Sequence, residues 1–157
     1  ISYSAAISAC EKSLQWQGAI GLLSEMGKII IAPNMITYSA AISGCAKGQM
    51  WQGTLSFLSE MGEARITPNT ITCNSAISTC EKGQQWQGAL CLFTGMGRAR
   101  LVQDVITFSA AISACETARQ WEGALRLLGE MRQIRILPNT VTYNSELSVC
   151  EKNLQWQ

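Results

Sequence analysis

A 35-residue period runs through the whole sequence without insertion or deletion. It is clearest in a column of cysteines at Cys10, Cys45, Cys80, Cys115 and Cys150. Three further columns have the same period. One is mostly aromatic (Tyr3, Tyr38, Cys73, Phe108, Tyr143), one is tryptophan (Trp16, Trp51, Trp86, Trp121, Trp156) and one is methionine (Met26, Met61, Met96, Met131). A fixed period of about 20–50 residues is typical of a repeat architecture. We therefore divide the chain into repeats at 1–34 (lacking its first residue), 35–69, 70–104, 105–139 and 140–157 (one helix only).

Each repeat predicts two helices joined by a tight turn. In the second repeat, Tyr38, Ala41, Ile42 and Cys45 follow the spacing of one helix face, and a second such series starts at Trp51. A hairpin of this size cannot bury both faces by itself, so the hairpins must stack into an all-α solenoid. We expect first helices near 3–12, 37–47, 72–82, 107–117 and 142–152, and second helices near 15–26, 50–61, 85–96 and 120–131.

The helix ends are predicted from residue type. Thr37 is expected to cap the first helix with its hydroxyl, and Ser2, Thr72, Thr107 and Thr142 are its equivalents. Gly48 is expected to end that helix in the left-handed conformation, and Pro68 to end the second helix. The second helices also contain glycines, which we interpret as sites of close helix packing: Gly18, Gly53, Gly88 and Gly123.

Composition narrows the classes of function. The net charge is +1 and no apolar run approaches the ~20 residues of a membrane span, so neither property indicates nucleic acid or a membrane. Seven cysteines without a C-x-x-C pair, and no histidine, argue against a disulfide framework and a zinc site. We expect the cysteine column to be buried, reduced and unreactive, in a reducing compartment. The sequence starts and stops within the repeat pattern, which predicts a fragment of a longer array.

The motifs ITYSAAISGCAKG, GALRLLGEM and ILPN, recurring in register, resemble the pentatricopeptide repeat family. The tetratricopeptide repeat is the nearest rival, but it has a period of about 34 residues and a different W-L-G-Y pattern. The resemblance implies a right-handed α-solenoid that binds single-stranded RNA, with one base read per helical repeat by two or three side chains.

The resemblance also implies which residues meet the RNA. The residue after the aromatic position and the last residue of the repeat would read the base: Ser4 with Asn34, Ser39 with Asn69, Asn74 with Asp104, Ser109 with Asn139, and Asn144 without a partner. An aliphatic residue two before the aromatic position would sandwich the base: Ile1, Ile36, Ile71, Ile106 and Val141. Lysines at the end of the first helix would meet phosphates: Lys12, Lys47, Lys82 and Lys152.

The residues themselves allow other interpretations. Ser39 follows Tyr38 and so points away from the apolar face, and Ser43 shares its side of the helix. Short polar residues there suit hydrogen bonding to a ligand, but they also serve as local capping residues. A lysine at a helix C-terminus equally complements the helix dipole. The acidic column Glu11, Glu81, Glu116 and Glu151 offsets the lysine charge, so weak binding is expected.

We predict a monomeric RNA-binding part of a longer protein that processes or stabilises RNA in mitochondria or plastids, as the resemblance implies. It is expected to need no cofactor, membrane or small-molecule substrate and not to be an enzyme, because no nucleophile–base pair, metal cluster or phosphate loop occurs. A groove that holds a peptide is the alternative function, and a near-identical array without a specific target is a third.

Two finer predictions follow. In the family, Ser with Asn goes with adenine and Asn with Asp with uridine, and the chain runs parallel to the RNA. The repeats therefore predict 5′-A-A-U-A-3′, followed by a pyrimidine at Asn144. Separately, Trp51, Trp86 and Trp121 are predicted to be buried between adjacent repeats as core residues, and not to stack on bases.

Overall fold

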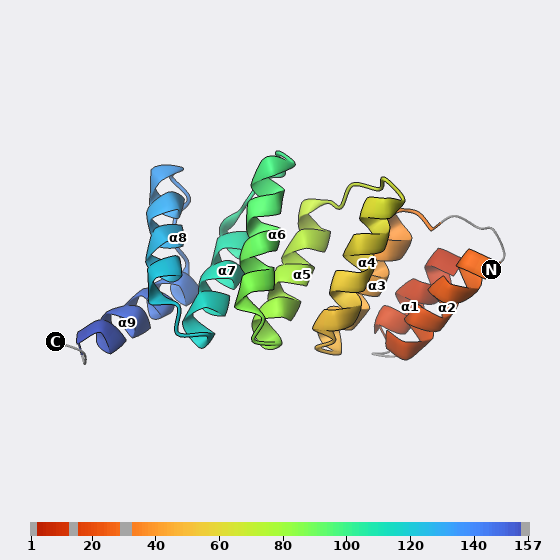
Figure 1. Cartoon of the computed structure of the whole chain (residues 1–157), viewed down its shortest axis with the longest axis horizontal. Helices are drawn as coiled ribbons and strands as arrows, with labels where there is room; N and C mark the ends of the chain where they lie inside the picture. The colour runs from red at the N-terminus through yellow and green to blue at the C-terminus, as the bar shows by residue number, and fades with distance from the viewer. Residues whose placement is uncertain (1–2, 13–15, 29–32, 155–157) are drawn as a thin grey trace.

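The computed structural model describes residues 3–12, 16–28 and 33–154 of the chain (Figure 1). In these ranges the secondary structure is entirely helical, and no strand occurs. The helices are α1 (Tyr3–Lys12), α2 (Trp16–Lys28), α3 (Met35–Lys47), α4 (Trp51–Glu63), α5 (Thr70–Lys82), α6 (Trp86–Arg98), α7 (Val105–Thr117), α8 (Trp121–Gln133) and α9 (Thr140–Leu154). The prediction of an all-α, right-handed solenoid is confirmed.

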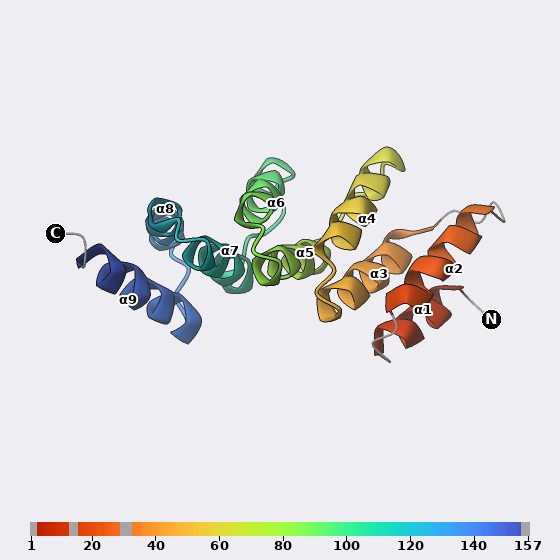
Figure 2. The ribbon, with the colours of Figure 1, turned by 60° about the horizontal axis from the view of Figure 1, so that its bottom comes forward.

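The helices form two layers along an elongated molecule. Each odd-numbered helix contacts the next odd-numbered helix, and each even-numbered helix packs between the helix before it and the helix after it. Figure 2 shows α4 and α6 on one side of the layer that α3, α5 and α7 form. Among the described residues, no even-numbered helix contacts another. The odd-numbered helices are therefore the continuous layer of the solenoid.

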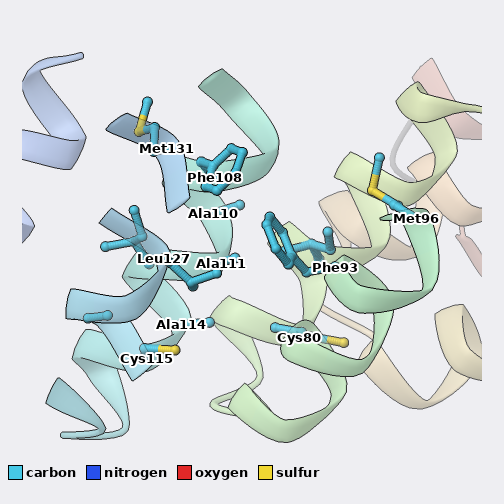
Figure 3. Packing of buried hydrophobic residues seen from close by; sticks show 14 of the residues in the cluster. Cys80, Phe93, Met96, Phe108, Ala110, Ala111, Ala114, Cys115, Leu127 and Met131 are labelled. Atoms are coloured by element: carbon cyan, nitrogen blue, oxygen red, sulfur yellow. The ribbon is translucent and has the colours of Figure 1, made fainter. Parts of the chain in front are cut away.

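The core is a ribbon that continues from repeat to repeat. Two clusters of buried apolar side chains meet at α5, where Ala76 belongs to one and Ile77 to the other. In the second cluster the rings of Phe93 and Phe108 lie edge to face, with centroids 4.9 Å apart (Figure 3). That pair joins α6 to α7. Each even-numbered helix likewise packs against the first helix of the next repeat.

α1 spans the predicted residues, whereas α3, α5, α7 and α9 begin two residues earlier than predicted, because Thr37 and its equivalents are not the caps. The cap of α3 is Asn34, whose side chain accepts from the backbone N–H of Thr37 at 3.0 Å. Asn69, Asp104 and Asn139 accept from the equivalent threonine N–H groups in the same way. The threonines lie inside the first turn and give their hydroxyl protons to the capping residue. Ser2 lies outside the described residues.

The turn prediction also needs correction. Gly48 has φ −81°, an ordinary helical value, and the left-handed residue is its neighbour Gln49, with φ 57°. The backbone N–H of Met50 donates to the carbonyl of Cys45 at 2.9 Å, which closes a Schellman-type turn around Gln49. The same conformation recurs at Gln84 and Arg119, and after the second helices at Arg65, Arg100 and Arg135.

Glycine in this turn serves packing. A Cβ atom built on Gly83 would lie 2.5 Å from Cδ1 of Trp51, which belongs to the preceding repeat. Trp51 thus lies between adjacent repeats, as predicted, and Trp86 is also half-buried against the core. Trp121 is 45% exposed, so its prediction as a core residue is wrong. The positions in register with Gly83 are Ala118, which follows Trp86, and Asn153, which follows Trp121, so of these three tryptophans only Trp51 has a glycine at this position.

The glycines inside the second helices do mark close packing. Cβ atoms built on Gly53, Gly88 and Gly123 would lie 3.3, 3.4 and 3.3 Å from the Sγ atoms of Cys45, Cys80 and Cys115. Each glycine therefore faces the column cysteine of its own hairpin. Those three thiols are buried, and burial raises the pKa of Cys45 and Cys80 to about 11. The prediction of a buried and unreactive column is supported at these positions.

Candidate nucleic-acid interface

The layer of odd-numbered helices carries a hollow of about 430 Å³ between α3, α5 and α7. Its lining is Ser43, Ala46, Lys47, Thr70, Ile71, Asn74, Ser75, Ser78, Lys82, Asp104 and Ile106. These include the predicted reading pair of the third repeat, the aliphatic residues of two consecutive repeats, and two lysines of the predicted phosphate column. The volume falls within the range of small-ligand pockets, about 300–1,000 Å³.

The structure brings together the members of the three reading pairs that it describes in full, although they are thirty residues apart in sequence. Nδ2 of Asn74 donates to Oδ1 of Asp104 at 3.2 Å. Oγ of Ser109 lies at the same distance from Oδ1 of Asn139, although its shorter hydrogen bond, at 2.7 Å, is to the carbonyl oxygen of Val105. Ser39 and Asn69 are joined through a third residue, described below. The pairing is set by the stacking of consecutive hairpins, since the first member lies on one odd-numbered helix and the second caps the next.

The outermost pairs are described only in part. Ser4 belongs to α1, but its side chain is outside the described set, while Asn34 is exposed at the start of α3. Asn144 is exposed on α9. Ile1 is outside the described residues.

The predicted sandwiching residues form an exposed apolar column. Ile36, Ile71, Ile106 and Val141 are 59%, 71%, 59% and 49% exposed. Each is the second residue of its helix, two residues after the capping residue of the preceding repeat. Ile71 and Ile106 line the hollow that also contains Asn74 and Asp104. An apolar side chain with this exposure is informative because it recurs at the repeat period, next to polar residues.

Two of the four predicted phosphate lysines can be placed. Lys47 and Lys82 end α3 and α5, are exposed, and line the hollow. Lys12 ends α1 and Lys152 lies in α9, but their side chains are outside the described set. Both described lysines also lie in the last turn of a helix, where a cation complements the dipole.

Two carboxyl groups shape the electrostatics of this face. Burial raises the pKa of Glu81, against the lowering effects of Lys82 and a hydrogen bond with Ser113, while Glu116 raises it further. Burial also raises the pKa of Asp104, but hydrogen bonds from Thr107, Asn74 and the backbone of Ile106 outweigh this effect, and the net result is a lowered pKa. Asp104 is therefore ionised at neutral pH and can only accept hydrogen bonds.

Sequence reasoning missed a column of functional interest, the threonines it had assigned as caps. Thr72, Thr107 and Thr142 are buried, at 1%, 0% and 0% exposure. Their hydroxyl groups lie within hydrogen-bond distance of both members of the preceding pair. The signal in the sequence was the recurrence of threonine one residue before the aromatic position in repeats two to five, with serine in the first repeat.

Other binding chemistry is not indicated where the structure describes the chain. In that part, no group of three Cys, Asp or Glu side chains is placed to hold a metal ion. None of the helices in the same ranges is long and apolar enough to cross a membrane.

Comparison with known families identifies the architecture. A family model described as pentatricopeptide repeat domain matches residues 21–82 and 91–153, and a PPR repeat model matches residues 1–29. The chain belongs to the pentatricopeptide repeat family. No curated protein matches this pentatricopeptide repeat chain in sequence.

Solved pentatricopeptide repeat structures are similar to it in fold. PPR10 in complex with an 18-nt psaJ RNA element aligns at 25% identity and a TM-score of 0.77, covering 95% of this chain and 22% of that one. PPR10 from maize aligns at 24% identity and a TM-score of 0.73, covering 91% and 20%. The PPR domain of Arabidopsis thaliana protein-only RNase P 1, in complex with tRNA, aligns at 13% identity and a TM-score of 0.87, covering 98% and 83%. The chain thus spans about a fifth of the length of the PPR10 chains.

Proposed function

We propose that the face formed by the odd-numbered helices binds single-stranded RNA and that each repeat reads one base. The observation that carries this proposal is the hollow between α3, α5 and α7. There the Asn74–Asp104 pair, exposed aliphatic residues on either side and the two helix-terminal lysines converge. A base needs hydrogen-bonding groups at its edge and apolar surface against its faces, and its phosphate needs a cation nearby.

The recurrence of these groups favours RNA over a peptide. Three features recur every 35 residues: the exposed isoleucine or valine, the polar pair, and the helix-terminal lysine, which Thr117 replaces in the fourth repeat. The polar pairs are confined to Ser or Asn with Asn or Asp. A peptide groove has no reason for that confinement. PPR10 and the PPR domain of protein-only RNase P 1 are both known in complex with RNA, which adds to the proposal. We propose binding as the role of this chain, and catalysis has no part in it.

The order of the pairs gives the proposed sequence 5′-A-A-U-A-3′, followed by a pyrimidine. The third repeat differs from the others because its pair is Asn74 with the ionised Asp104. A carboxylate accepts hydrogen bonds only, and so suits a base edge that donates, such as N3–H of uracil. With only about four bases read, the chain should bind weakly and in a strongly salt-dependent way.

The test exchanges the pair of the third repeat in the full chain. Asn74→Ser with Asp104→Asn creates the pair found in the second repeat. Asparagine at position 104 can still cap α7, because its amide oxygen accepts from a backbone N–H as the carboxylate does. We expect the preferred third base to change from U to A in filter-binding or fluorescence-anisotropy titrations against four oligonucleotides that differ only there. Cys91→Ser is the matched control, because Cys91 is exposed on α6, outside the residues that line the hollow.

A preference that stays at U, or equal binding of all four oligonucleotides by the parent chain, would refute base reading by these pairs. Absence of RNA binding at low salt would refute the wider proposal and favour the peptide groove. The organelle and the RNA process served stay predictions from the family, to be tested by locating a fluorescent fusion of the full reading frame.

A further inference from the structure

Each of the three reading pairs that the structure describes in full contacts a buried threonine of the following repeat. Thr72 Oγ1 lies 2.6 Å from Ser39 Oγ and 2.8 Å from Asn69 Oδ1. Thr107 Oγ1 lies 2.7 Å from Asn74 Oδ1 and 2.9 Å from Asp104 Oδ1. The fourth repeat has the same three-residue cluster, formed by Ser109, Asn139 and Thr142. The threonine therefore contacts both members of the pair from beneath.

In the second repeat, the backbone fixes the orientation of the Asn69 amide, and the hydroxyl of Thr72 connects that amide to Ser39. Oδ1 of Asn69 accepts from the backbone N–H of Thr72 at 2.9 Å, so the amide oxygen must face α5. Thr72 has one hydroxyl proton and donates it to the same oxygen. With that proton used, Ser39 is the donor in its 2.6 Å contact with Thr72, and the thioether of Met35, at 3.4 Å, is the weaker of the two acceptors near the Ser39 hydroxyl.

The groups left over have defined polarity. The lone pairs of Ser39 remain to accept, and the amide nitrogen of Asn69 remains to donate. The nitrogen's contact within the chain is the weak thioether acceptor of Met35, at 3.4 Å. A ligand therefore meets one acceptor and one donor in a fixed order, although serine and asparagine could each present either group if they were free to rotate.

The third repeat shows the same constraint with a different result. Oδ1 of Asp104 accepts from the backbone N–H of Thr107 at 2.9 Å, and Nδ2 of Asn74 donates to that oxygen at 3.2 Å. The hydroxyl of Thr107 is shared between this oxygen and Oδ1 of Asn74. What remains for a ligand is the second carboxylate oxygen of Asp104 and the second N–H of Asn74.

We propose that Thr72, Thr107 and Thr142 are positioning residues that set which donor and acceptor each reading pair presents to the base. The inference rests on the proposed function, and it adds that the specificity of a repeat is completed by the third residue of the next repeat. Changing this threonine then alters base selectivity one repeat upstream, at a base that its own repeat does not read.

The experiment uses the full chain and oligonucleotides that vary at the third base alone or the second base alone. Thr107→Val keeps the shape of the side chain and removes its hydroxyl. We expect its selectivity at the third base to fall by about tenfold, the effect of roughly one hydrogen bond, while selectivity at the other bases is unchanged. Thr72→Val should reduce selectivity at the second base alone, which gives an independent measurement if one variant folds poorly.

Two controls separate positioning from stability. Thr54→Val removes an equally buried hydroxyl, on α4, whose hydrogen bond is to the carbonyl of Met50. It should lower the melting temperature without changing any selectivity ratio. Thr107→Ser should restore selectivity because it restores the hydroxyl. If the parent chain is selective and Thr107→Val keeps that selectivity at the third base, the positioning role is wrong. If the parent chain shows no selectivity, base reading itself fails.

Discussion

Gly83→Ala should destabilise the chain although the backbone at this residue suits any amino acid. Gly83 ends α5, with φ −81° and ψ 4°. A Cβ atom there would lie 2.5, 2.8 and 3.1 Å from three atoms of Trp51, distances that require the indole or α5 to shift. Overpacking of this kind costs about 1–3 kcal/mol. Replacing glycine by alanine at a permitted conformation gives back about 0.4–1 kcal/mol through the unfolded chain, so a net loss of about 1–2 kcal/mol is expected.

The measurement is urea denaturation followed by circular dichroism, in a double-mutant cycle with Trp51→Ala. In the Trp51→Ala chain the steric conflict is gone, and Gly83→Ala should become neutral or stabilising. Gly62→Ala is the matched control: nothing lies within 4 Å of a Cβ atom at this exposed position in α4, so a gain of up to about 1 kcal/mol is expected. An equal loss from Gly83→Ala with and without Trp51 would refute the packing explanation.

Three further predictions concern other positions. Gln84→Gly should raise the free energy of unfolding by about 0.5–1 kcal/mol, because Gln84 has φ 55° and glycine relieves that strain; urea midpoints of this variant and Gln84→Ala test it, and only the glycine should gain. Iodoacetamide at pH 8 should label exposed Cys91 much faster than Cys45 and Cys80, whose pKa is raised to about 11 by burial, as mass spectrometry of digests would show. Glu81→Gln should tighten RNA binding about threefold at low salt by removing a negative charge beside the lysine column, and the gain should shrink at high salt in anisotropy titrations.

The repeat pattern was sufficient to predict the fold. The 35-residue register predicted both helices of each hairpin, and the second helices start within one residue of the predicted position. This prediction succeeds because the spacing of apolar residues follows the helix face that is buried. α3, α5, α7 and α9 were predicted two residues short, because Thr37 and its equivalents were taken as caps. An asparagine three residues upstream of the threonine is also a preferred capping residue, and residue type alone does not decide between the two.

The site was predicted less completely than the fold. The family resemblance paired Asn74 with Asp104, but the hydrogen bond between them depends on how consecutive helices stack, which no single repeat contains. The glycine of the turn was assigned to the left-handed position by residue type, whereas the structure puts Gln49 there and leaves Gly83 to admit Trp51. In both cases the deciding contact lies between repeats, where a sequence read one repeat at a time carries no direct signal.

The last residue of each repeat has two roles, helix capping and the proposed base reading, and together they limit which residue types can occupy the position. Asn69 and Asp104 cap α5 and α7 with one oxygen, and the rest of each side chain is left for the proposed base. Only Asn, Asp, Ser and Thr side chains cap a helix well, and loss of such a cap costs about 0.5–2 kcal/mol. Stability therefore restricts this position to a few residue types, and among them asparagine leaves a donor where aspartate leaves an acceptor. Capping and base reading are compatible because they use different atoms of one short side chain, and the buried threonine beside it determines which atom serves which purpose.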